Sequence, residues 1–207
     1  VEVAQFVTAV DCVYLDDQRV GRLSAQECAF GYRDSVFKRE LRDGVVITAV
    51  EFRLPLAAAP VIDYPDLQQE LVNTVAPTPQ QVHDAVVAIR RRKLPDPAVE
   101  PNAGSFFKNP VLPVTQLAYL KLGFSTMPVY PVDDDYRKVP AAWLIDQCGL
   151  KGTREGDIGV HGGHALVLVN HGSGTGEQLL VLVERIRARV MQRFGISLEV
   201  EPRIYSG

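Results

Sequence analysis

The feature that most constrains the fold is a strand, helix and strand pattern over residues 165–204. Residues 165–170 are apolar and β-branched, which favours a buried strand. A glycine-rich turn, 172–176, then leads into a long amphipathic helix, and residues 196–204 predict a final strand. This part is a βα-type unit, and we predict that the chain as a whole is α+β. The inner face of the helix carries Leu179, Leu182, Val183, Ile186, Val190 and Phe194.

The first half of the chain contains strand signals followed by a long connection. Stretches rich in Val, Ile and Tyr predict strands over residues 9–15 and 45–54. Residues 55–77 are instead rich in Pro, Ala and Asp around an isolated Tyr64. That composition is typical of a long loop or a domain connection.

Three further helices are predicted between residues 78 and 148. The first begins at Thr78, which offers an N-cap followed by a proline and, three residues after the cap, a glutamine. Leu94-Pro95 ends it. Two shorter helices, 114–122 and 140–148, flank a loop at 128–138. We expect the first helix to pack against a sheet through Val82, Ala85, Val86 and Ile89.

Composition excludes several classes of protein. The 207 residues are 46% hydrophobic, enough for a sizeable core, and the net charge of −3 gives no general attraction to nucleic acid. No apolar run approaches the roughly 20 residues of a membrane span, and no signal peptide opens the chain. Its three cysteines are widely separated, so we expect reduced packing residues in a soluble, cytoplasmic protein.

Metal and phosphate-loop chemistry are not predicted. His161 and His164 flank a Gly-Gly pair, but two histidines without a nearby carboxylate or cysteine are a weak ligand set. The glycine-rich turn 172–176 lacks the GxxxxGK[ST] pattern of a phosphate loop.

The run 101–110, PNAGSFFKNP, combines a hydroxyl at Ser105, two aromatic residues, a cation and an amide between prolines. This composition is typical of a shaped binding loop. The alternative is a tight turn that enters a strand, with Phe106 and Phe107 as ordinary core residues.

Further motifs stand in a fixed order around this run. They are FGYRDSVFK at 30–38, KLPDP at 93–97, AAWLIDQ at 141–147 with Lys151-Gly152, Val160-His161, and LEVEPRI at 198–204. Together they resemble the UDP-N-acetylenolpyruvoylglucosamine reductase family over nearly the whole chain. The family's members are flavoenzymes that complete UDP-N-acetylmuramate synthesis in bacterial cell-wall assembly.

The resemblance implies a domain organisation and cofactors. Residues 1–57 are expected to complete the FAD-binding α+β domain, and 58–77 to form a connecting loop with Tyr64. The α+β substrate-binding domain would span 78–195, and 196–207 would return towards the FAD-binding region. The family's N-terminal flavin-binding region is expected to precede Val1, so the flavin-binding residues stay unassigned. FAD is the implied cofactor and NADPH the co-substrate.

The resemblance also implies three catalytic residues. Arg33 would polarise and stabilise the substrate carboxylate, Ser105 would donate a proton, and Glu201 would act as an acid or polarising partner. From the residues alone, Arg33 could form a surface ion pair with Asp34, and Ser105 could simply bond to backbone. The stretch 199–203 also alternates like an edge strand with charges facing solvent.

A nucleotide-sugar diphosphate needs cations and hydroxyls from several elements. By resemblance, Tyr32 lines the site, and Asn109 and Tyr130 contact the uridine or the sugar. His164 occupies a position where the family's better-known form has glutamine. The cations Arg90 and Lys93 could instead complement a helix C-terminus. The substrate-binding residues are Tyr32, Tyr64, Arg90, Lys93, Asn109, Tyr130, Lys151 and His164.

The expected activity is the NADPH-dependent reduction, through FAD, of UDP-N-acetylglucosamine enolpyruvate, by a monomer without nucleic-acid or membrane partners. Two alternatives stay open. This chain by itself would be a UDP-sugar-binding module without catalysis, or the protein would be another flavin oxidase or dehydrogenase of the same superfamily. The second alternative shares the cofactor but lacks the Ser105 loop and the Lys93 segment.

Overall fold

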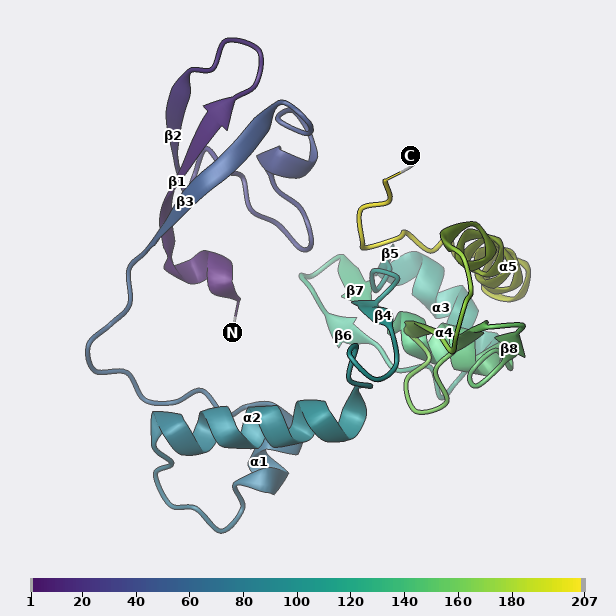
Figure 1. The fold of residues 1–207 in the computed structure, drawn as a ribbon. Helices are drawn as coiled ribbons and strands as arrows, with labels where there is room; N and C mark the ends of the chain where they lie inside the picture. The colour runs from purple at the N-terminus through teal and green to yellow at the C-terminus, as the bar shows by residue number, and fades with distance from the viewer. Residues whose placement is uncertain (1, 206–207) are drawn as a thin grey trace. The chain divides into compact units, whose positions relative to one another are not determined.

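The computed structural model describes residues 2–205 (Figure 1). The chain divides into two compact units, residues 1–82 and 83–207. Each unit has its own buried cluster of apolar side chains.

The first unit contains a three-stranded antiparallel sheet in the order β2-β1-β3. β1 (Val7–Tyr14) and β3 (Val45–Phe52) confirm the two predicted strands, whereas β2 (Val20–Ser24) was not predicted. β2 pairs with β1 after the polar turn that begins at Asp16, so it forms a hairpin. Short 3-10 helices cover Val3–Phe6 and Val36–Lys38. The buried cluster consists of Val7, Val10, Cys12, Leu23 and Cys28.

The stretch 55–77, predicted to be a long loop or a domain connection, contains one short helix. Residues Pro65–Glu70 form a short helix, α1, with Tyr64 at its N-cap and a proline at its first position. Leu67 is only 5% exposed, and its burial anchors the helix. A proline that starts a helix and a proline that breaks one look alike in sequence, which explains why this helix was not predicted.

Helix α2 (Pro79–Lys93) has the predicted bounds. The backbone N–H of Gln81 donates to Thr78 Oγ1 at 3.3 Å, and Gln81 Oε1 accepts from the Thr78 N–H at 2.9 Å. This reciprocal pair is the predicted capping box. Ala85 and Ile89 are buried, but the prediction that Val86 shares their face is wrong, since its side chain is 39% exposed. The buried face of α2 is therefore narrower than the set of apolar residues in its sequence suggests.

The second unit contains two small antiparallel sheets, with strand orders β4-β10-β9-β8 and β5-β7-β6. Apart from β10, which begins two residues later than predicted, these strands are short and were not predicted. Their pairing depends on partners distant in sequence rather than on local pattern. The first sheet comprises β4 (Asn102–Ser105), β8 (Arg154–Glu155), β9 (Ile158–Val160) and β10 (Val167–Asn170). The second comprises β5 (Val111–Pro113), β6 (Tyr130–Pro131) and β7 (Tyr136–Lys138).

Three helices surround the core of this unit: α3 (Val114–Gly123), α4 (Ala141–Gln147) and α5 (Gly176–Phe194). The long helix α5, olive in Figure 1, contacts α4 and β9. It begins with a capping box between Thr175 and Gln178 and ends at Gly195, whose φ is +65°. All of its predicted inner residues are buried except Leu179, which is half-buried.

The predicted final strand over 196–204 is reduced to one isolated bridge, between Val200 and Phe107. Pro202 lacks an N–H to continue a ladder, which accounts for the short pairing. Cys12 and Cys28 are buried and Cys148 is half-buried, each as a free thiol. Between residues 2 and 205, no helix is both long enough and apolar enough to cross a membrane.

Candidate functional site

Ser105 is the last residue of β4, and Asn102, the first residue of this strand, shapes its backbone. Asn102 Oδ1 accepts the backbone N–H of Gly104 at 2.9 Å, and Asn102 Nδ2 donates to the carbonyl of Glu100 at 2.8 Å. Gly104 has a φ of +71°, which glycine adopts without the steric cost of a Cβ. Ser105 then pairs opposite Val167 of β10 and is half-buried. The serine therefore stands on a sheet edge whose entry is held by side-chain hydrogen bonds.

Glu201 lies directly beside this strand. Its backbone N–H donates to the carbonyl of Phe106 at 2.9 Å. One pair further on, the N–H of Lys108 donates to the carbonyl of Glu199 at 2.8 Å, and Lys108 Nζ also pairs with the Glu199 carboxylate. The structure thus brings the segments that carry Ser105 and Glu201 together, although 96 positions of sequence separate these two residues.

The aromatic pair after Ser105 belongs to the core. Phe106 is 3% exposed and Phe107 1%, with their ring centroids 5.7 Å apart in an edge-to-face arrangement. The interpretation of these rings as core residues is therefore correct. Because they are buried in this core, they anchor the strand that carries Ser105.

A group of positive side chains gathers around His164. Its imidazole is half-buried between β9 and β10, and this burial lowers its pKa below the usual 6.5. The charges of Lys151 and Lys93 lower the pKa further. Lys93 ends α2 and Lys151 follows α4, and both are exposed. Three predicted substrate residues from three elements therefore share one electrostatic environment.

The other predicted substrate residues of the second unit lie on separate elements. Asn109 Oδ1 accepts the backbone N–H of Ala141 at 2.9 Å and so caps the start of α4. Tyr130, on β6, stands opposite Lys138 and is 54% exposed. Arg90 is exposed on the last turn of α2.

In the first unit, Tyr32 and Arg33 occupy the tip of a tight turn. Gly31 and Asp34 close it, with N–H to carbonyl distances of 2.9 and 3.2 Å in the two directions. Arg33 has a φ of +54°, a strained conformation for a residue with a Cβ. Its guanidinium carbon lies 5.6 Å from the centre of the Tyr32 ring. Tyr64 is exposed at the start of α1.

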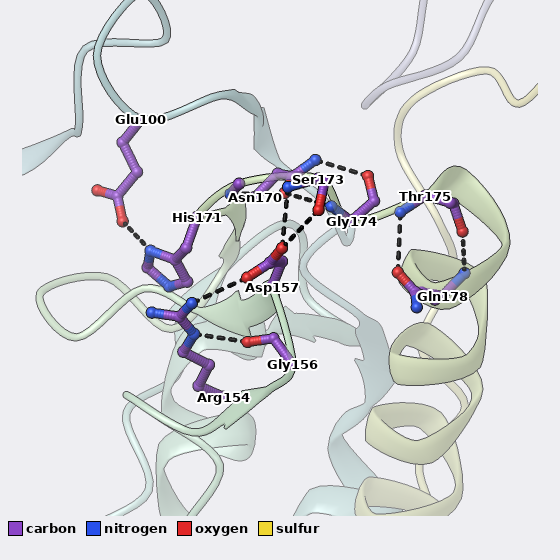
Figure 2. A network of polar contacts seen from close by, with 11 residues as sticks. Glu100, Arg154, Gly156, Asp157, Asn170, His171, Ser173, Gly174, Thr175 and Gln178 are labelled. Carbon is purple, nitrogen blue, oxygen red and sulfur yellow. Dashed lines mark hydrogen bonds and ion pairs between the residues drawn. The ribbon is translucent and has the colours of Figure 1, made fainter.

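The glycine-rich turn before α5 is closed by hydrogen bonds to neighbouring side chains (Figure 2). Asn170 Oδ1 accepts the N–H groups of Gly172 and Gly174, both at 3.1 Å, and Asp157 Oδ2 accepts the N–H of Ser173 at 2.9 Å. The hydrogen bond from the Ser173 N–H, with those from the Ser173 hydroxyl and Arg154, lowers the pKa of Asp157. The amides that a phosphate would need are already occupied. Sequence reasoning did not single out Asn170 or Asp157.

A cavity of about 200 Å³ lies beneath this turn. Its walls are mainly apolar. Asn102 and Asn170 also line it, and the Nδ2 of each donates to a backbone carbonyl, that of Glu100 and that of Gly174 respectively. Among residues 2–205, no group of three or more His, Cys, Asp or Glu side chains is arranged to hold a metal ion. The apolar wall is formed by Ala103, Phe106, Ile158, Leu168, Val169 and Leu179.

Comparison with known proteins identifies the family. Residues 96–205 match the family model described as UDP-N-acetylenolpyruvoylglucosamine reductase, C-terminal domain. This chain belongs to that family. The predicted family and the predicted α+β class are thereby confirmed.

Curated relatives match beyond the domain. The chain is 52% identical over 207 residues to the UDP-N-acetylenolpyruvoylglucosamine reductase of Chromobacterium violaceum, covering 99% of this chain and 61% of the relative. It is 50% identical over 206 residues to that of Xanthomonas axonopodis pv. citri, covering 98% of this chain and 59% of the relative. The chain therefore spans about three fifths of the length of these relatives.

A solved structure gives the same fold. The crystal structure of the reductase from Thermus caldophilus aligns with a TM-score of 0.58 and 24% identity, covering 98% of this chain and 54% of that one. At that identity the likeness shows the fold alone.

Proposed function

We propose that this chain forms part of an oxidoreductase that reduces UDP-N-acetylglucosamine enolpyruvate to UDP-N-acetylmuramate, with NADPH as co-substrate and FAD as cofactor. Membership of the reductase family supports the reaction class. The observation that carries the site is the pairing of the Ser105 strand with the Glu201 segment. We place the reaction in cytoplasmic cell-wall precursor synthesis.

Three residues take the catalytic roles in this proposal. Bound flavin would supply the hydride. The Arg33 guanidinium offers two parallel donors to the substrate carboxylate and stabilises the charge that develops there. The Ser105 hydroxyl donates the proton to the neighbouring carbon, and Glu201 acts as an acid or polarises the substrate. A guanidinium, a hydroxyl and a carboxylate fit the substrate side of this chemistry, so we assign all three to the substrate rather than to FAD.

The cationic group around His164 is assigned to the diphosphate. Lys93 and Lys151 supply point charges, and His164 supplies an imidazole donor. Asn109 and Tyr130 are assigned to the uridine or sugar, although the amide oxygen of Asn109 already caps α4. The remaining assigned contacts are Tyr32, Tyr64 and Arg90.

We also propose the domain roles inferred from the family. Residues 1–57 belong to the flavin-binding domain, 58–77 connect, 78–195 bind the substrate, and 196–207 return towards the flavin-binding region. The boundary between the two compact units falls within α2, between residues 82 and 83.

Calorimetric titration of the chain with UDP-N-acetylglucosamine enolpyruvate tests the binding half. We expect saturable heat, and about tenfold weaker affinity in Lys93→Ala and in Lys151→Ala, since each loses one charge-assisted contact. Lys121→Ala, an exposed lysine on α3, is the matched control and should bind like the parent. A folded chain that gives no heat, or equal affinity in all variants, contradicts the diphosphate assignment.

The catalytic half requires a protein that contains bound FAD. There Ser105→Ala should slow reoxidation of the reduced flavin by the enolpyruvyl substrate by about 10²–10⁴-fold, while NADPH still reduces the flavin at the parent rate. Unchanged turnover would remove Ser105 as the proton donor.

A second candidate is a UDP-sugar-binding module without catalysis. It is favoured by the placement of Lys93, Lys151, His164, Ser105 and Glu201 in a single compact unit, residues 83–207. Saturable heat with the substrate, together with no flavin absorbance after incubation in excess FAD and gel filtration, would support this reading for the chain as it stands.

A further inference from the structure

His161 holds the loop that leads to His164. Its Nδ1 lies 3.2 Å from the backbone nitrogen of Gly163 and 3.1 Å from that of His164, and both of these groups are donors. Nδ1 must therefore accept, which requires that it carry no proton. The proton of the His161 ring is accordingly on Nε2.

Glu100 stands at the other side of this ring. Its Oε2 lies 3.7 Å from His161 Nε2, and its Oε1 lies 3.3 Å from Nδ1 of His171. The contact with His171 is drawn in Figure 2. The side chains of all three residues are between 23% and 29% exposed, so water screens them only in part. A carboxylate facing Nε2 favours the tautomer that Nδ1 requires.

The loop held in this way connects to the Ser105 strand. The N–H of Leu166 donates to Nδ1 of His164 at 3.3 Å, and the N–H of Val167 donates to the His164 carbonyl at 3.0 Å. The carbonyl of Leu166 then accepts the N–H of Phe106 at 2.8 Å. A Cβ at Gly163 would lie 3.0 Å from Cε1 of His161, so the ring and the loop fit closely.

We infer that His161 is a positioning residue: its Nδ1 holds the Gly162–His164 loop so that the Nε2–H of His164 faces the diphosphate site, and Glu100 selects the required tautomer. This inference rests on the proposed function for the ligand that His164 meets. It assigns roles to two side chains that do not themselves touch the substrate. His171 supports Glu100 from the loop after β10.

Two substitutions distinguish the roles of the two ring nitrogens of His161. In His161→Asn, Oδ1 takes the place of Nδ1 and still accepts the two backbone N–H groups. In His161→Gln, the side-chain amide takes the place of Nε2, and that acceptor is lost. With UDP-N-acetylglucosamine enolpyruvate as the probe, we expect affinity within about twofold of the parent for asparagine and about tenfold weaker for glutamine. Equal affinities, or the reverse order, would overturn the inference.

Nuclear magnetic resonance provides a test that does not depend on the ligand. Long-range proton–nitrogen spectra of the histidine rings should show His161 and His164 both in the Nε2–H form near neutral pH. Glu100→Ala should add signal from the Nδ1–H form of His161, whereas Glu184→Ala, on the surface of α5, should not. An Nδ1–H ring at His161 in the parent refutes the positioning role even if the probe binds. The predicted tautomers without any probe binding would refute the proposed function alone.

Discussion

At the scale of single residues, polar side chains in this chain fix the backbone around the candidate site. Asn102 shapes the backbone of β4 before Ser105, and Asn109 caps α4. The sequence placed both in a functional motif, and the structure shows hydrogen bonds that the motif did not reveal. A local sequence pattern identifies candidate functional residues more readily than it identifies the atoms through which each of them forms hydrogen bonds.

Substitution of Asn109 tests whether its side chain stabilises the start of α4. Asn109→Ala removes the acceptor for the Ala141 N–H, and we expect the free energy of unfolding to fall by about 1 kcal/mol. Asn109→Asp keeps an acceptor at a helix N-terminus and should unfold like the parent. Urea unfolding followed by circular dichroism measures both. Equal loss in the two variants would show that the cap is not the relevant contact.

His164 makes stability depend on pH. Its pKa is lowered in the folded chain, chiefly by burial, so on acidification the unfolded chain takes up this proton first. Stability from the neutral ring is present above the unfolded value of 6.5 and is lost as pH falls below it towards the folded value. Between about pH 7.5 and pH 5.5, the parent should therefore lose more unfolding free energy than His164→Gln does. Urea titrations at both pH values compare them, and parallel losses would exclude the effect.

At the scale of elements, helices were predicted better than strands. The capping boxes at Thr78 and Thr175 lie within four consecutive residues each, so local sequence contains the whole signal. Short strands such as β6 and β8 have two residues each, and their pairing depends on distant partners. The segment 196–204 has a strand-like pattern but pairs through one bridge only.

Substitutions in the turn before α5 test how closely this turn packs against its neighbours. A Cβ at Gly174 would lie 2.4 Å from Cδ1 of Ile158, so Gly174→Ala must displace the turn or the isoleucine. We expect a loss of about 1–3 kcal/mol in unfolding free energy. Gly176→Ala is the matched control, because nothing lies within 4 Å of its added Cβ and it begins a helix. It should leave stability unchanged or raise it by up to about 1 kcal/mol. Equal thermal midpoints for the two variants would contradict this packing.

At the scale of the whole molecule, two compact units carry the candidate residues. Arg33, Tyr32 and Tyr64 belong to the first, whereas Ser105, Glu201 and the cationic group belong to the second. The second has a continuous buried cluster from Phe106 to Leu198. A cluster of that size is typical of a segment that folds cooperatively.

This cluster predicts that residues 78–207 fold without the rest of the chain. Trp143 is the only tryptophan of the sequence and packs against this core, so its fluorescence reports this unit alone. Urea should produce one sigmoidal transition by Trp143 fluorescence that coincides with the loss of helix by circular dichroism. A gradual, non-cooperative change in either signal would show that the core needs residues outside 78–207.

The sequence by itself determined the family, the α+β class and the longer helices, because ordered motifs, caps and apolar periodicity are local properties of the chain. Only the tertiary structure placed Glu201 beside the Ser105 strand and His164 near Lys93 and Lys151. It alone showed that His161 contacts the backbone of His164 and that Glu100 in turn contacts His161. Such contacts join residues far apart along the chain, and their geometry follows from packing and strand pairing that no local window contains.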